Sequence, residues 1–238
     1  MNYTKFDILI VCNGYSKRLD ACLHFWEKSY YSKNNYRIII STWDKDHKTL
    51  DVISKYLDRK ILNVIVALNH DSDFHNKGKM IQNAFEIIKD NLYDFVFMSD
   101  ADMIFHPETL VNMNYITSSS KEIMISSFRE DVIENEVEEI LLNEKYKFKK
   151  NIDWPWSNLS LQIRSPSPFM GWFLSFHSSF LSKINFLINH EGYDVIDWKI
   201  YGQLLSIGLK EKILHTMHMP LHMSHGKKGS NWSGITVF

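Results

Sequence analysis

Short apolar runs and segments with apolar residues at helical spacing alternate along the first hundred residues. The apolar runs predict strands at 8–11, 37–40, 63–68 and 94–98. The helical spacing predicts helices between them at 18–28, 50–57 and 77–89. A chain that alternates in this way favours an α/β fold, in which a mostly parallel sheet carries flanking helices. Ligands of such sheets bind at the carboxyl ends of the strands.

The pattern changes after residue 110. The charged segment Glu130–Lys150 predicts one helix with a buried stripe of five apolar residues, namely Val132, Ile133, Val137, Ile140 and Leu141. An aromatic and proline-rich stretch at 154–168 is irregular, and 173–188 and 217–238 show no clean period. A further helix is expected at 197–209, ending at Gly208. Since no repeat, low-complexity tract or linker divides the chain, we expect residues 1–238 to form a single domain.

Composition and charge exclude several classes of protein. The chain has 238 residues, 45% of them hydrophobic, and a formal net charge of -1. A near-neutral chain lacks the clustered cations that a nucleic-acid footprint needs. The two cysteines, Cys12 and Cys22, predict buried thiols in a reducing compartment. The longest apolar run near the start is too short to span a membrane, so we expect a cytoplasmic protein that touches a membrane at most from its surface.

Two carboxylates follow the fourth expected strand. Asp100 and Asp102 are two positions apart, so they project in the same general direction if the chain stays extended. A hard divalent cation takes oxygen ligands and can bridge the phosphates of a nucleotide. The pair therefore suits a metal diphosphate, although a solvated turn after a strand would show the same residues.

Histidines and lysines provide a second group of candidates. His222 and His225 lie close together near the end of the chain, and imidazole is a common metal ligand. Most single histidines are structural, which remains the alternative for both. Lys77 and Lys79 open the third expected helix, where they could meet phosphate or simply face solvent.

Four segments, in this order, carry a resemblance to a known family. They are Asn76–Phe85 (NKGKMIQNAF), Ser99–Asp102 (SDAD), Phe169–Trp172 (FMGW) and Gly192–Asp197 (GYDVID). Together they resemble motifs of the GT-A (Rossmann-like) glycosyltransferases, and among these the β-1,4-galactosyltransferases and the chondroitin-polymerase type of family 2 enzymes. The resemblance implies transfer of a hexose or N-acetylhexosamine from a UDP-sugar to a glycan or lipid-linked glycan, as in surface polysaccharide synthesis.

The resemblance also implies roles for single residues on the donor side. Asp102 and His225 would bind Mn²⁺ or Mg²⁺, with His222 at the position of a methionine ligand. Residues implied in nucleotide-sugar binding are Asn13, Lys77, Lys79, Asp100, Gly171 and Trp172. Residues 1–110 would then form the nucleotide-sugar half of the domain, and 111–238 the acceptor-binding and catalytic half, which includes an acceptor-side subdomain.

On the acceptor side, Asp197 falls at the position of the catalytic base of an inverting reaction. A helix N-cap is the alternative for this residue. Tyr193 stands where the family stacks a tryptophan on the acceptor sugar, and Trp154 and Trp156 are candidate platforms, with a place in the core as their alternative.

Three residues depart from the family pattern, and two of these departures, at Ile196 and Trp172, keep a second interpretation open. Ile196 replaces the glutamate before the catalytic aspartate, Trp172 replaces a small glycine, and Tyr193 replaces the stacking tryptophan. A catalytically silent GT-A module that binds a nucleotide sugar or glycan would tolerate these changes. A nucleotidyltransferase is a third reading, but residues 13–18 fit its Gly-rich basic signature poorly.

Overall fold

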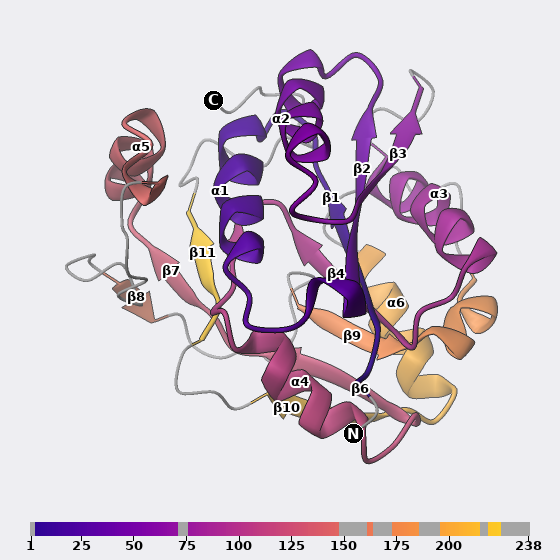
Figure 1. The fold of residues 1–238 in the computed structure, drawn as a ribbon. Coiled ribbons are helices and arrows are strands. Elements are labelled where there is room, and N and C mark those ends of the chain that lie inside the picture. The colour runs from indigo at the N-terminus through magenta and orange to yellow at the C-terminus, as the bar shows by residue number, and fades with distance from the viewer. Residues whose placement is uncertain are drawn as a thin grey trace.

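A computed structural model of the chain describes residues 3–70, 76–147, 161–163, 173–185, 196–214 and 219–224. A seven-stranded sheet, ordered β10-β6-β9-β4-β1-β2-β3, forms its centre (Figure 1). Its strands are β1 (Phe6–Val11), β2 (Tyr36–Trp43), β3 (Val64–Asn69), β4 (Phe95–Asp100), β6 (Ile123–Ser127), β9 (Leu174–His177) and β10 (Lys210–Leu214). Only β9 runs antiparallel to its neighbours, β4 and β6. This confirms the expected mostly parallel α/β sheet.

Two layers of helices cover the sheet because neighbouring residues of each strand point to opposite faces. In β1, Phe6, Ile8 and Ile10 pack toward α1, α2 and α4, whereas Leu9 and Val11 pack toward α3 and α6. The helices are α1 (Ser16–Glu27), α2 (His47–Arg59), α3 (Lys77–Asp90), α4 (Thr109–Thr117), α5 (Glu134–Leu142) and α6 (Ile196–Ser206). Figure 1 shows α1 and α2 on one side of the parallel strands and α3 on the other. The expected helices between the first four strands are thereby confirmed.

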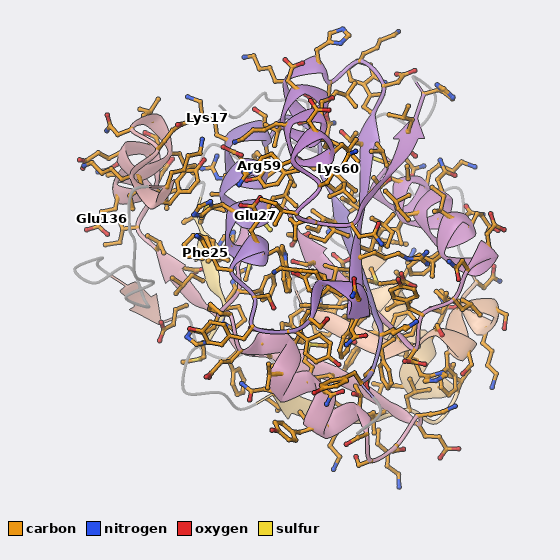
Figure 2. All side chains as sticks on the ribbon, in the orientation of Figure 1. Lys17, Phe25, Glu27, Arg59, Lys60 and Glu136 are labelled. Carbon is orange, nitrogen blue, oxygen red and sulfur yellow. The ribbon has the colours of Figure 1, made fainter. Side chains whose placement is uncertain are left out.

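A second, four-stranded sheet lies beside α1 and has the order β5-β11-β7-β8. Its strands are β5 (Met103–Ile104), β7 (Glu130–Val132), β8 (Leu161–Ile163) and β11 (Leu221–Met223). Phe25 of α1 belongs to the apolar cluster that joins this sheet to α5, and Figure 2 shows its side chain on the flank of α1 that is turned toward them. The opposite flank of α1 meets α2 through the ion pair of Glu27 with Arg59 at 2.9 Å.

The segment Glu130–Lys150 was expected to be one helix, and this prediction is wrong. Its first three residues form β7 because their backbone pairs with both β11 and β8. The helix α5 begins only at Glu134, and the 3-10 helix η3 (Lys145–Lys147) follows it. Val137, Ile140 and Leu141 do form a buried stripe, whereas Val132 is buried as a strand residue.

Other strands were missed because they are short or mixed in composition. Lys210–Leu214 has three charged residues before its two apolar ones, and Leu221–Met223 has only three residues. Two further 3-10 helices are η1 (Lys33–Asn35) and η4 (Ser178–Lys183). Cys12 and Cys22 are buried free thiols, as expected. No helix in the ranges given above combines the length and apolar character that crossing a bilayer requires.

Candidate active site

Asp100 and Asp102 lie at the carboxyl end of β4, near the centre of the large sheet. Asp100 is the last residue of β4 and pairs in register with Val11, the last residue of β1. Asp102 follows after one residue and is buried. The expected carboxylate pair therefore lies at the edge where parallel sheets bind ligands.

Lys77 connects this edge to α6. Its ammonium lies 3.1 Å from Asp100 Oδ1 and 2.9 Å from Asp197 Oδ2, and its side chain is only 10% exposed. Burial lowers the pKa of Lys77, but the two carboxylates outweigh that effect and hold its pKa above the ordinary value. Burial raises the pKa of Asp100, with Lys77 opposing the shift and Asp102 and Asp197 adding to it. One buried cation thus pairs with two carboxylates.

The local sequence explains how Lys77 reaches Asp197. Asn76 caps α3, accepting a hydrogen bond from the backbone N–H of Lys79 at 2.9 Å, so Lys77 is the first residue of the helix. A Cβ on Gly78 would come within 3.2 Å of Ile196 Cδ1. The absence of that Cβ lets the first turns of α3 and α6 approach closely.

Asp197 is the second residue of α6, inside the first turn, rather than the residue that caps it. The positive end of the helix dipole favours a carboxylate there. Its Oδ2 accepts from Lys77, while its Oδ1 is buried and has no hydrogen-bond partner within the described ranges. A buried carboxylate oxygen without a donor can accept a proton or a hydrogen bond from a bound molecule.

His222 meets Asp102 from the small sheet. Its Nε2 lies 3.3 Å from Asp102 Oδ2, and its Nδ1 lies 2.7 Å from Asp131 Oδ1. Burial lowers the pKa of His222, but Asp102 and then Asp131 outweigh burial and raise it above the ordinary value. The backbone N–H of Met223 also donates to the carbonyl of Asp102 at 2.8 Å, so β11 is fixed against the Asp-x-Asp segment.

The pair of Asp102 and His222 can be tested for its fit to a divalent cation. Two ligands at right angles, each about 2.1 Å from one ion, lie about 3 Å apart. The observed 3.3 Å between Nε2 and Oδ2 is close to that separation, and a carboxylate with an imidazole is a suitable donor set for Mn²⁺. The two residues therefore fit adjacent positions around one ion. No group of three or more His, Cys, Asp or Glu side chains suited to a metal occurs among the residues that the structure describes.

The loop after β1 forms another part of this edge. Asn13 is buried there, and Gly14 adopts a φ of 73°, in the left-handed region that glycine favours. The N–H of Gly14 donates to Asp46 Oδ2 at 2.6 Å, and Asp46 caps α2. Asn13 thus lies on the same edge as Asp100, while the side chain of Lys79 makes no ion pair within the described ranges.

Several expected site residues lie outside the described residues: Trp154, Trp156, Gly171, Trp172, Tyr193 and His225. Three residues near the site were not predicted from the sequence: Asp131, Arg129 and Arg18. Asp131 was assigned to a helix, and only the strand pairing of β7 brings it to His222. Arg18 is buried in α1 and donates to the carbonyls of Met223 and Ser224, both at 3.4 Å. The sequence does not distinguish a buried arginine from the lysines and arginines that lie on the surface.

Comparison with known proteins identifies the fold but no sequence family. No protein-family model matches the sequence, and no curated protein matches it. Among solved structures, TarS 1–349 of S. aureus in complex with UDP-GlcNAc is similar with a TM-score of 0.66 and 15% identity, over 98% of this chain and 62% of that one. A mannosyltransferase of Pyrobaculum calidifontis in complex with GDP-Man and Mn²⁺ has a TM-score of 0.65 and 9% identity, over 95% and 59%.

A third similar structure is GalNAc-T7 with UDP, GalNAc and Mn²⁺, with a TM-score of 0.64 and 12% identity, over 93% of this chain and 44% of that one. The chain therefore spans less than two thirds of the length of these proteins. At such identities the likeness establishes the fold, which is the GT-A fold that the four motifs predicted.

Proposed function

We propose that this chain is a metal-dependent, inverting glycosyltransferase that moves a hexose or N-acetylhexosamine from a nucleotide diphosphate sugar, such as a UDP-sugar, to a hydroxyl of a glycan. The observation that carries the proposal is the position of Asp197. The buried ammonium of Lys77 pairs with both Asp197 and Asp100, at the ligand-binding edge of a GT-A sheet. One oxygen of Asp197 has no donor among the described residues.

The donor side of the proposal uses groups at the ends of β1 and β4 and at the start of α3. Asp102 and His222 would hold the divalent cation, and Asn13, Lys77, Lys79 and Asp100 would bind the nucleotide sugar. Gly171, Trp172 and His225 retain their expected roles, outside the described residues. When bound, a divalent cation neutralises the charge that develops on the leaving diphosphate.

Asp197 would act as the general base. As the acceptor oxygen attacks the anomeric carbon, its proton passes to Asp197 Oδ1, the bond from carbon to oxygen forms, and the bond from that carbon to the phosphate oxygen breaks. The nucleoside diphosphate leaves with the electron pair. A positioned base of this kind contributes ~10²- to 10⁴-fold. Attack from the face opposite the diphosphate inverts the anomeric centre.

On the acceptor side we assign Tyr193, Trp154 and Trp156, whose flat rings suit the apolar faces of sugars. Residues 1–110 would form the nucleotide-sugar half and 111–238 the acceptor half. The buried thiols of Cys12 and Cys22 suit a reducing compartment, so we place the reaction in the cytoplasm, at the surface of a membrane when the acceptor is lipid-linked.

The first experiment measures thermal stabilisation by nucleotide sugars with and without Mn²⁺. UDP-GlcNAc, UDP-GalNAc, UDP-Gal, UDP-Glc and GDP-Man are the probes, since similar folds were solved with UDP- and GDP-linked donors. Release of nucleoside diphosphate is then measured against a panel of glycan acceptors. Mn²⁺-dependent binding together with acceptor-dependent release of diphosphate would support the proposal.

The variant Asp197→Asn separates the enzyme from a silent binding module. It keeps the size of the side chain and its place in α6 but removes the base, so turnover should fall ~10²-fold or more while donor binding persists. Asp58→Asn, on the exposed face of α2, is the matched control. Donor binding without any transfer by the wild type would instead favour the silent module.

A further inference from the structure

The imidazole of His222 is held between two carboxylates that come from different parts of the chain. Its Nδ1 is 2.7 Å from Asp131 and its Nε2 is 3.3 Å from Asp102. All three side chains are buried, with exposures of 7% for His222, 4% for Asp131 and 5% for Asp102. The ring therefore has a carboxylate at each nitrogen and little contact with solvent.

The pairing of β11 produces this arrangement. His222 lies opposite Asp131 in the parallel pair of β11 with β7, and opposite Met103 in the antiparallel pair of β11 with β5. Directly opposite residues of paired strands project from the same face of a sheet. The register therefore places Asp131 beside the imidazole, and a slip of one residue would turn it to the other face.

Arg129 holds Asp131 in place. Its Nε is 3.1 Å from Asp131 Oδ1, the oxygen that also faces His222, and the arginine side chain is 11% exposed. At 2.7 Å, Asp131 Oδ1 is within hydrogen-bond distance of Nδ1 and can accept its proton. Nε2, on the other side of the ring, faces Asp102 at 3.3 Å.

We infer that Asp131, held by Arg129, is a positioning residue for His222 as a metal ligand. It fixes the ring orientation and the tautomer in which Nε2 is available to an ion shared with Asp102. A histidine that binds a metal commonly donates its other N–H to such a carboxylate, and loss of that partner costs ~10- to 100-fold in metal affinity. The inference rests on the proposed function, because it assumes that Asp102 and His222 bind a divalent cation.

Calorimetry of the full chain with Mn²⁺ in the presence of UDP, and separately of GDP, tests the inference. Asp131→Asn keeps the shape but removes the charge, and Asp131→Ala removes the acceptor. Both should lower the Mn²⁺ affinity ~10- to 100-fold, with the larger loss for Asp131→Ala. Because the asparagine is isosteric, that variant should remain folded, which its circular dichroism spectrum will show.

Asp20→Asn is the matched control, since Asp20 is another buried, ion-paired carboxylate but contacts Lys55, Tyr146 and Lys147 instead of His222. It should lose stability and keep Mn²⁺ affinity. Wild-type affinity in a folded Asp131→Asn protein and in Asp131→Ala, or an equal loss in Asp20→Asn, would overturn this inference alone. No Mn²⁺ binding by the wild type with either nucleotide would overturn the metal part of the proposed function as well.

Discussion

The ammonium of Lys77 lies 2.9 Å from the carboxylate of Asp197, the proposed general base. The two residues lie in the first turns of different helices, α3 and α6, and they are 120 positions apart in the sequence. The ion pair fixes one carboxylate oxygen of Asp197 and leaves the other without a donor among the described residues. Lys77 therefore holds Asp197 in an orientation that leaves its Oδ1 open to a proton from the acceptor.

Lys77→Met should impair the base without removing it. Without the ammonium, two buried carboxylates lose the cation they share, and Asp197 loses the partner that fixes its Oδ2. We expect turnover to fall ~10²-fold because the base is displaced from its position. Lys89→Met, at the other end of α3, where Lys89 pairs with exposed Glu86, is the control. Unchanged turnover in Lys77→Met would contradict this role.

The metal assignment predicts that Asp102→Asn and His222→Gln each abolish the part of UDP affinity that depends on Mn²⁺. Each side chain would bind the ion directly, so each substitution would remove one of its ligands. UDP binding is measured by calorimetry with Mn²⁺ and again after chelation with EDTA. His106→Gln, with a histidine from the loop after β5, is the control. If both variants kept the full Mn²⁺-dependent gain, the ligands would lie elsewhere.

Gly78→Val should separate the first turns of α3 and α6. The added carbons would enter the space beside Ile196, where even a Cβ comes within 3.2 Å, and Lys77 would be displaced from Asp197. A displacement of about 1 Å at a reacting group can cost ~10²-fold in rate. Gly202→Val on α6 makes the same change in helix propensity, but a Cβ added there meets no atom within 4 Å. This variant should therefore keep a normal kcat. Recovery of kcat in Gly78→Val with Ile196→Ala would confirm a steric cause.

Asp20 predicts a pH dependence of stability. Burial raises the pKa of Asp20, but hydrogen bonds from Lys147, Lys55 and Tyr146 outweigh it and lower the pKa from 3.8 to about 2. A lowered folded-state pKa contributes stability that is present above pH 3.8 and is lost as the pH falls toward 2. The contribution is about 2 kcal/mol.

Urea unfolding of wild type and Asp20→Asn checks this. The wild type should be more stable by about 2 kcal/mol at pH 7, and the difference should shrink between pH 4 and pH 2. Asp58→Asn, with an exposed carboxylate, should show no such convergence. A difference that stays constant down to pH 2 would show that the ion pairs contribute little.

Local patterns in the sequence were sufficient for the half of the fold that is built from βαβ units. The strand expected at 94–98, observed as Phe95–Asp100, was predicted from its apolar run, and the helix that begins at Lys77 was predicted from its helical spacing. The ion pair of Lys77 with Asp197 could not be predicted from such patterns, since it depends on a close approach of two helices distant in sequence. Asp131 was missed for a related reason. In β7 its environment comes from β11 and β8, and the neighbouring charges suggested a helix.

The contacts that assemble the site are among the most distant along the chain, with 120 positions between Lys77 and Asp197 and 91 between His222 and Asp131. Closing loops of this length costs chain entropy that is recovered only once the surrounding core has formed. The units of β1 to β3 pair with their chain neighbours, so we expect them to form first, during synthesis or refolding. The contacts of Lys77 with Asp197 and of His222 with Asp131 would then form in the slowest phase. Recovery of nucleotide binding would therefore lag behind the recovery of helix and sheet content.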